Sequence, residues 1–271
     1  MEGIQGAYGK MIIHTFGTSS GTQPFPGFHH TSLAVETTNG LYFVDAGECG
    51  AYTAHIAGTD LLKTRAVFIT HPHMDHIGGL GNLLWYIRKV DTVEKKGRMD
   101  GKNIDIFSPV RESVDGFFQV LKNTEGNFAC PYSHTVHSVT DGHIYSDKEE
   151  NLSVYAVHNS HLDKTPDGRY PSFSYIFREN EKTVVFSGDI RLSDIKTILP
   201  EKTDAFFVET GHHQIEDICK EIKKQKKQVK KLFFTHHGGY IMKDPEQALM
   251  RAKMAFGENT VICRDGDSYT L

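Results

Sequence analysis

The chain has 271 residues, 38% of them hydrophobic, and its 34 aspartates and glutamates outnumber 30 lysines and arginines, for a net charge of −4. This composition excludes a collagen, a coiled coil and a wholly disordered chain, and it excludes nucleic-acid binding through bulk positive charge. No stretch approaches the roughly 18 to 20 uncharged residues of a membrane span, and residues 1–30 lack a signal-peptide layout. The four cysteines form no CxxC pair and are expected to be reduced thiols. We therefore expect a soluble, cytoplasmic protein that does not act at a membrane.

Short β-type runs, rich in β-branched and aromatic residues, are predicted to open the chain. They cover residues 11–16, 32–36, 41–44 and 67–70. The turn signal Asn39-Gly40 predicts a hairpin between the second and third runs. Apolar residues recur at helical spacing after His76, which predicts a helix there. The charged segment Asp91 to Asn103 is expected to be a surface loop, and we interpret the region around residues 91–130 as an insertion that could cap a cleft.

A second helix is predicted over Gln214 to Lys231, because an apolar stripe recurs along this segment. Seven lysines cover much of its remaining surface. Such a face either attracts a phosphate-bearing substrate or is merely solvated.

Two distant parts of the chain resemble one another. Residues 32–47 and 172–189 each predict a hairpin whose second strand leads into an aspartate in a glycine-containing loop, and Val67–His71 matches Leu232–His236. The repeat suggests an α/β fold in which two stacked β-sheets, related by a pseudo-twofold axis, carry helices outside and aim their strand ends at one cleft. No linker separates the halves, so residues 1–271 are predicted to form a single domain.

Histidines are numerous and clustered: the chain has sixteen, and imidazole is the commonest metal ligand in proteins. The densest group is His71-Pro72-His73-Met74-Asp75-His76. Residues two apart on an extended strand point to the same side, so His71 and His73 can bind one ion. Asp75 and His76 fall at the start of the next helix and can reach a second ion. Four ligand-type side chains in six residues predict a metal site rather than a chance polar loop.

This group matches the HxHxDH motif of the metallo-β-lactamase superfamily in full, and the resemblance extends over nearly the whole chain. Phe16-Gly17-Thr18-Ser19 and Asp45-Ala46-Gly47-Glu48 resemble the superfamily's opening loop and first aspartate motif. The closing segment Val261 to Gly266 is similar to the ribonuclease Z branch. The resemblance implies a four-layer αββα sandwich of two mixed β-sheets.

The same resemblance implies a site for two divalent ions. His161 follows a strand similar to the one that ends in the superfamily's third histidine, with His158 as the competing residue, and Ser187-Gly188-Asp189 resembles the bridging aspartate motif. The implied ligands are His71, His73 and His161 for one ion, Asp75, His76 and His236 for the other, and Asp189 as the bridge. Nitrogen and oxygen ligands without thiolate suit zinc, and also manganese or iron. Asp45 is expected to orient a ligand histidine.

Two ions about 3.5–4 Å apart can share a water and clamp the oxygens of an in-line displacement, so we expect a metal-dependent hydrolase that uses a metal-bridging hydroxide. Asp189 stands where zinc β-lactamases use cysteine, which argues against antibiotic hydrolysis. Members of the ribonuclease Z branch bind transfer RNA through a protruding arm, which the chain forms between the third histidine and the bridging aspartate. Here Asp189 follows His161 by only 28 positions, which leaves no space for an arm, and transfer RNA is not expected as a partner.

The predicted activity is therefore that of a phosphodiesterase acting on a small molecule or nucleotide. A lactone or ester hydrolase and a non-catalytic metal-binding sensor remain alternatives, and a homodimer is left open. The branch's His-Glu-Ala-Thr motif, whose histidine assists the leaving group, appears here as Val208-Glu209-Thr210-Gly211 without the histidine. We assign catalytic roles to Asp75, Glu209 and His237, the last either lining the cleft or merely exposed, with His212 and His213 as further candidate proton donors.

Overall fold

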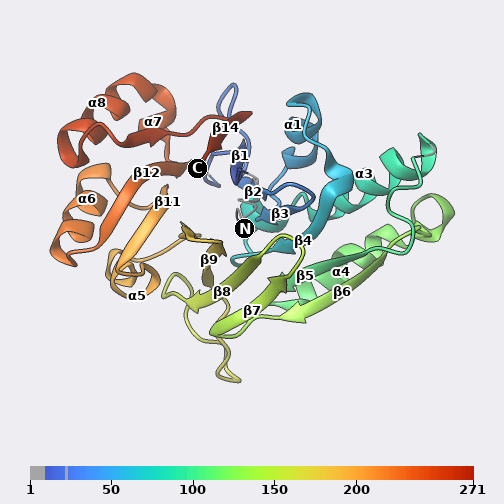
Figure 1. Cartoon of the computed structure of the whole chain (residues 1–271). Coiled ribbons are helices and arrows are strands. Elements are labelled where there is room, and N and C mark those ends of the chain that lie inside the picture. Colours follow the sequence, from blue (N-terminus) through green and yellow to red (C-terminus); the bar gives the residue numbers. More distant parts are fainter. Residues whose placement is uncertain (1–9, 22–23, 95) are drawn as a thin grey trace, which may run out of the picture.

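The computed structural model of the chain describes residues 10–21, 24–94 and 96–271. Within these ranges the strands form two seven-stranded mixed sheets that pack face to face, and helices cover the outer face of each sheet (Figure 1). The predicted four-layer αββα sandwich is confirmed. No helix in the described ranges is long and apolar enough to cross a membrane.

The first sheet has the strand order β14-β1-β2-β3-β4-β5-β6. Its strands are β1 (Ile12–Gly17), β2 (Ser32–Glu36), β3 (Leu41–Val44), β4 (Thr64–Phe68), β5 (Asn103–Ser108), β6 (Ser133–Ser138) and β14 (Asp267–Thr270). Strands β3 to β6 run parallel, so their carboxyl ends share one edge. The helices of this half are α1 (Gly50–Ile56), α2 (Met74–Ile77), α3 (Leu80–Val93) and α4 (Arg111–Leu121), with short 3-10 turns at Leu61–Lys63 and Glu125–Phe128.

The second sheet has the order β13-β12-β11-β10-β9-β8-β7. Its strands are β7 (Gly142–Asp147), β8 (Leu152–His158), β9 (Phe173–Glu179), β10 (Lys182–Phe186), β11 (Lys202–Thr210), β12 (Gln228–His237) and β13 (Thr260–Ile262). Strands β10 to β13 are parallel. The helices of this half are α5 (Ile195–Ile198), α6 (Ile215–Lys224), α7 (Gly239–Lys243) and α8 (Pro245–Phe256), with a 3-10 turn at Leu192–Asp194.

Both faces of the inner strands are apolar, because each sheet is covered on both sides. In β2, Leu33 and Val35 pack between the two sheets, whereas Ala34 faces the helical layer of the first half. This alternation follows from the two-residue period of a strand. Three apolar clusters result, one between the sheets and one beneath each helical layer. Polar side chains of the types that bind metal therefore lie at the ends of the strands.

The predicted repeat is reproduced in part. Antiparallel pairing joins β2 to β3 and β9 to β10, as the two hairpin patterns predict. The two Thr-His segments do not occupy equivalent places, however. Strand β4, which precedes His71, lies beside β3, whereas β12, which carries His236, is separated from β10 by β11.

One predicted segment is corrected by the structure. The helix predicted over Gln214 to Lys231 ends at Lys224, and Gln228 already begins β12. Lys226 has a left-handed φ of 55°, which ends the helical path, and Val229 pairs with Thr203 in the sheet. Outside residue 95, which is not described, the region around 91–130 supplies β5, paired between β4 and β6, and α4, and its interpretation as an insertion stays a prediction.

An acid-sensitive ion pair joins β1, β2 and the turn before β4. The Glu36 carboxylate accepts hydrogen bonds from His14 at 2.8 Å and Lys63 at 2.7 Å, and these contacts lower its pKa to about 2. Because the folded-state pKa lies below the ordinary value of 4.5, the pair stabilises the fold fully above about pH 4.5 and is lost as pH falls toward 2.

We expect Glu36→Gln to reduce the free energy of unfolding by about 1–2 kcal/mol at pH 7, allowing for solvent screening. Urea titrations of both proteins between pH 7 and pH 3 measure the difference. It should shrink as pH falls below 4.5, and a difference that stays constant over this range would contradict the assignment.

Candidate metal centre

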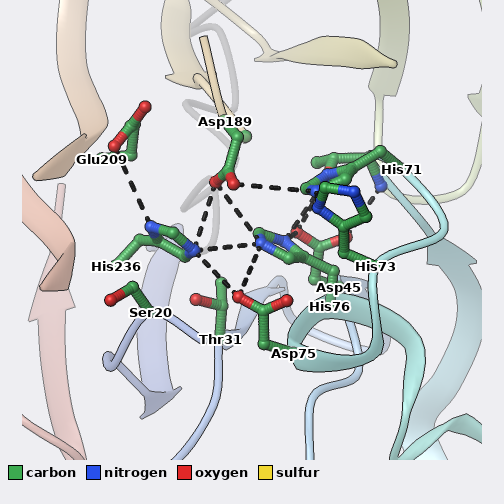
Figure 2. Close-up of polar contacts among 12 residues, drawn as sticks. Ser20, Thr31, Asp45, His71, His73, Asp75, His76, Asp189, Glu209 and His236 are labelled. Carbon is green, nitrogen blue, oxygen red and sulfur yellow. Dashed lines mark hydrogen bonds and ion pairs between the residues drawn. The ribbon is translucent and has the colours of Figure 1, made fainter. Parts of the chain in front are cut away.

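The seven predicted ligands come together at one edge of the two sheets. His71 follows β4, His161 follows β8, and Asp189 follows β10. His236 lies near the end of β12 (Figure 2), at a β-bulge where Glu209 pairs with Thr235 but Thr210 pairs with His237. His236 is the extra residue of this bulge and has a φ of 47°. A bulge redirects a side chain, and here it accompanies a ligand-type imidazole that faces the other side chains.

The first group consists of His71, His73, His161 and Asp189, whose nearest ligand atoms all lie within 4.8 Å of one another. His73 Nδ1 is 3.0 Å from His71 Nε2 and 3.4 Å from His161 Nε2. Asp189 Oδ2 is 3.7 Å from His71 Nε2 and 3.6 Å from His161 Nε2. The predicted competitor, His158, is absent from this group.

The second group consists of Asp75, His76 and His236. His236 Nε2 lies 3.1 Å from His76 Nε2 and 3.2 Å from Asp75 Oδ2. The other oxygen of Asp189 faces this group, with Oδ1 at 3.4 Å from His76 Nε2 and 3.2 Å from His236 Nε2. The two oxygens of one carboxylate thus face two separate sets of ligand atoms.

These distances fit metal coordination. Four atoms bound tetrahedrally at the zinc–nitrogen distance of 2.0–2.1 Å are roughly 3.3 Å from one another. The atom-to-atom separations given above for the two groups lie between 3.0 and 3.7 Å. In addition, Asp189 Oδ1 is buried without a hydrogen-bond partner, which is costly unless a cation satisfies it. The described His and Asp residues can therefore bind metal.

Protonation in the metal-free chain reflects the concentration of charge here. Burial and the neighbouring His76 hold the pKa of His71 well below its ordinary value, so His71 is neutral, the form that binds metal. Burial opposes charge on His76, but Asp189 and Asp45 prevail and raise the pKa of His76. The carboxylates thus hold a proton where a cation would otherwise lie, and metal binding here would release it.

Asp45 orients His76, as expected. Its Oδ2 accepts a hydrogen bond from His76 Nδ1 at 2.7 Å, which turns Nε2 toward the other ligands. Asp45 also accepts hydrogen bonds from the backbone N–H of Thr70 at 2.7 Å and the Thr70 hydroxyl at 2.9 Å. Its φ of 63° is left-handed, a conformation that aspartate and asparagine tolerate better than most residues.

Asn159 is a positioning residue that the sequence did not reveal. Its side-chain oxygen accepts a hydrogen bond from the His161 backbone N–H at 3.2 Å, while its amide donates to Ser174 Oγ at 3.2 Å and the Ser187 carbonyl at 3.5 Å. Asn159 is 2% exposed. It therefore ties the loop that carries His161 to the strand end that leads into Asp189.

Glu209 lies behind the ligands and fixes His212. The carboxylate is 1% exposed and accepts hydrogen bonds from the His212 backbone N–H at 2.9 Å and from His212 Nδ1 at 3.1 Å. The hydrogen bond to Glu209 raises the pKa of His212 to about 9. His212 Nδ1 is 3.8 Å from Asp189 Oδ2, whereas His213 Nε2 donates to the Ile190 carbonyl.

His237 neither lines the cleft nor is exposed, contrary to expectation. Its side chain is fully buried, Nε2 donates to the Cys263 carbonyl at 2.8 Å, and Nδ1 lies 3.0 Å from the Thr210 hydroxyl. Burial lowers its pKa to about 4. A neutral, enclosed imidazole whose nitrogens are both engaged is not placed to protonate a substrate.

A cavity of about 250 Å³ lies over the ligands, and His73, Asp75, Asp189, His212 and His236 contribute to its lining. Two glycines allow the chain to approach this closely. A Cβ atom at Gly211 would lie 2.7 Å from His236 Nδ1, and one at Gly21 would lie 2.9 Å from Asp75 Oδ2. Any side chain at these positions would displace a ligand.

Comparison with known proteins shows the fold and the family of the chain. The chain is 29% identical over 188 residues to ribonuclease Z of Pyrococcus horikoshii, an alignment that covers 69% of this chain and 53% of that protein. The chain thus spans about half the length of the curated relatives it matches. Among solved structures it is similar to the metallo-β-lactamase fold protein YhfI of Bacillus subtilis, with a TM-score of 0.71, 17% identity, and coverage of 97% of this chain and 100% of that one.

Human tRNase Z, short form, is also similar, with a TM-score of 0.67, 16% identity, and coverage of 96% of this chain and 98% of that one. These likenesses confirm the metallo-β-lactamase fold and the predicted resemblance to the ribonuclease Z branch. A family model described as "Anti-Pycsar protein Apyc1" matches residues 11–256. With most of its length covered by that model, the chain belongs to the Apyc1 family of anti-Pycsar proteins within the metallo-β-lactamase superfamily.

Proposed function

We propose that this protein is a dinuclear metal-dependent phosphodiesterase that cleaves a small-molecule or nucleotide phosphodiester. The observation that carries the proposal is the position of Asp189, whose Oδ2 faces His71 and His161 and whose Oδ1 faces His76 and His236. A carboxylate in this position suits a bridge between two cations. Two divalent ions, either zinc or, as alternatives, manganese or iron, would lower the pKa of a water and neutralise negative charge on the phosphate.

His71, His73 and His161 would hold one ion, and Asp75, His76 and His236 the other, with Asp189 shared. Asp75 has a further role in the proposal. Burial opposes its charge, but the hydrogen bonds from His236 and His76 hold its pKa below the ordinary value, so it is ionised. Its side chain is 14% exposed at the cavity, where the carboxylate can accept a hydrogen bond from water and orient it toward a bound phosphate.

His212 is the proton donor that the geometry favours. It lines the cavity with a half-exposed side chain, and Glu209 fixes its ring at Nδ1. Its other nitrogen is then available to a leaving oxygen. Glu209 acts through His212 and is a positioning residue. His237 is not proposed as a proton donor, because its side chain does not reach the cavity.

We expect His212→Ala to lower kcat by about 100-fold or more, with bound metal retained and KM changed little. His213→Ala should lower kcat less than threefold, because His213 bonds to a backbone carbonyl. His237→Ala should reduce thermal stability more than turnover. Steady-state kinetics with metal analysis of the three variants test this assignment, and unaltered turnover in His212→Ala would remove it.

The relatives' names and the local fold support this class of substrate. Ribonuclease Z and tRNase Z are named for cleavage of RNA, itself a phosphodiester. Between His161 and Asp189 this chain has a short loop and the β9–β10 hairpin, with no additional helix or strand among the described residues. That compact connection supports a substrate smaller than transfer RNA. A homodimer remains a prediction from the sequence.

A substrate panel tests the proposal against its alternatives. The protein, loaded with zinc or manganese, is offered bis(p-nitrophenyl) phosphate, cyclic nucleotides, a lactone and a thioester. We expect turnover of phosphodiesters above that of the other two classes. Faster cleavage of the lactone would favour an ester hydrolase, and bound metal without turnover of any compound would favour a sensor.

A further inference from the structure

His161 lies on the longest of the segments that carry a ligand-type residue of the metal centre. It stands near the start of the loop 159–172 between β8 and β9, whereas the segment 69–73 carries His71 and His73, and the segment 187–191 carries Asp189. The His161 side chain is 13% exposed, against 0% for His71. Fixing one residue of a long loop costs conformational entropy. The position of His161 therefore depends on contacts that hold the start of this loop.

The carboxylate of Asp194 holds the start of the loop. Asp194 Oδ1 accepts a hydrogen bond from the Ser160 hydroxyl at 2.6 Å, and Oδ2 accepts one from the Ser160 backbone N–H at 3.0 Å. Both donors belong to the residue directly before His161. Hydrogen bonds to a carboxylate are among the stronger ones in proteins, so Ser160 is fixed at two points.

The same carboxylate also fixes the segment that carries Asp189. Asp194 Oδ2 accepts a third hydrogen bond, at 2.9 Å, from the backbone N–H of Arg191, two residues beyond Asp189. The Asp194 backbone N–H donates in return to the Arg191 carbonyl at 2.9 Å. Asp194 directly precedes α5, which is anchored by the buried side chains of Ile195 and Ile198. One anchored carboxylate thus joins the neighbours of His161 and Asp189, whose Nε2 and Oδ2 atoms are 3.6 Å apart.

A second link joins the same two segments at the surface. Arg191 Nη2 lies 3.7 Å from Asp163 Oδ1, and the two side chains are 63% and 97% exposed. Ion pairs this exposed contribute little to stability, because water screens them. The link through Asp194 is therefore the one expected to determine where His161 lies.

We propose that Asp194 is a positioning residue for the ion of the first group, because its hold on Ser160 keeps His161 at the distance from Asp189 that one cation can span. Asp194 acts through Ser160 and is not itself in a ligand group. The inference rests on the proposed two-ion function. It assigns the two ions different dependence on Asp194, because His76 and His236, in the second group, lie on α2 and β12.

Asp194→Ala removes the three hydrogen bonds that the carboxylate accepts. We expect the affinity for the ion of the first group to fall 10–100-fold, and the affinity for the other ion to stay within about twofold. Competition between the protein and a chelator for zinc measures both affinities. Anomalous diffraction from crystals grown at limiting zinc identifies which ion is lost.

Turnover of bis(p-nitrophenyl) phosphate gives a readout that a general loss of folding would not produce. Saturating zinc should restore the turnover of Asp194→Ala to within about threefold of wild type, because the ligands themselves are unchanged. At limiting zinc the variant should be slower than wild type by the factor by which its first-group ion is depleted.

Two further variants separate the position of Ser160 from the stability of the fold. Asp194→Asn should keep both affinities within about threefold, because its amide oxygen can accept from the two backbone N–H groups and its NH₂ can donate to the Ser160 hydroxyl. Ser160→Ala removes only the hydroxyl contact and leaves Asp194 in place before α5. It should weaken the ion of the first group by about threefold or more, and it decides the matter alone if Asp194→Ala does not fold.

Asp163→Ala is the matched control. It removes a carboxylate that joins the same two segments, but an exposed one. Both affinities should stay within about twofold of wild type. A loss of the first ion as large as in Asp194→Ala would contradict the proposal, since any link between the segments would then serve.

The outcomes separate the two proposals. If the wild-type protein binds two ions and cleaves the phosphodiester, but Asp194→Ala and Ser160→Ala keep both affinities or weaken both ions equally, the function stands and the role of Asp194 is wrong. If two ions bind without turnover of any phosphodiester, the proposed function fails, while selective loss of the first ion in the variants still supports Asp194. A wild-type protein that binds no ion beside His161 overturns both.

Discussion

Asp189→Asn should abolish binding of at least one of the two ions and reduce phosphodiester turnover by more than about 1,000-fold. The substitution keeps the size of the side chain but removes the charge and one of the two acceptor oxygens. Changes to residues that only support ligands cost 10–100-fold in metal affinity, and loss of a shared ligand should exceed this range. Metal content after dialysis, measured by mass spectrometry, and chelator competition check the result.

Asp163→Asn is the matched control for charge. Asp163 lies two residues beyond His161 and its side chain is 97% exposed. The substitution therefore removes the same charge near the site without altering a ligand residue. It should retain both ions and wild-type turnover. Two ions bound with unchanged affinity in Asp189→Asn would show that Asp189 is not the bridge.

Asp45→Asn should selectively weaken the binding of one of the two ions. The amide group of asparagine would face His76 Nδ1 as a donor, so that nitrogen would have to accept and the ring proton would move to Nε2. Nε2 is the atom that faces His236 and Asp189, and a protonated nitrogen cannot bind metal. We expect a 10–100-fold loss of affinity for the ion held by His76, with the other ion retained, as titration against a chelator would measure.

Asparagine at this position separates the effect on metal binding from an effect on the stability of the fold. Asparagine tolerates the left-handed φ of 63° and can still accept a hydrogen bond from the Thr70 N–H, so the stability of the metal-free chain should change little. Asp45→Ala would instead strain the backbone and leave that buried N–H unpaired, and it should lower the melting temperature. Identical affinities for both ions in wild type and Asp45→Asn would contradict the orienting role.

The sequence predicted the fold where the signals were local, and the structure brings the predicted ligand-type residues together. Each hairpin has an apolar run on both sides of a turn, and the six-residue histidine motif carries four ligand types. His161 could not be separated from His158 in this way, because both lie at the end of the same apolar run. What distinguishes them is contact with residues far along the chain: Asn159 ties the loop to Ser187, and Ser160 donates to Asp194 at 2.6 Å.

The failed predictions have similar physical causes. His237 stands beside a ligand in the sequence, but the bulge at His236 determines which of the two faces the centre. The lysines after Lys224 are good helix formers, yet Val229 joins the sheet, and tertiary pairing overrides helical propensity.

Anomalous X-ray diffraction from crystals of the protein loaded with zinc or manganese tests the pair of ions directly. Data collected at the absorption edge of the metal locate each ion without reference to activity. We predict two peaks, one on either side of the Asp189 carboxylate, the first beside His71, His73 and His161 and the second beside Asp75, His76 and His236. A single peak would contradict the dinuclear site, and the absence of any peak beside these residues would contradict the metal centre itself.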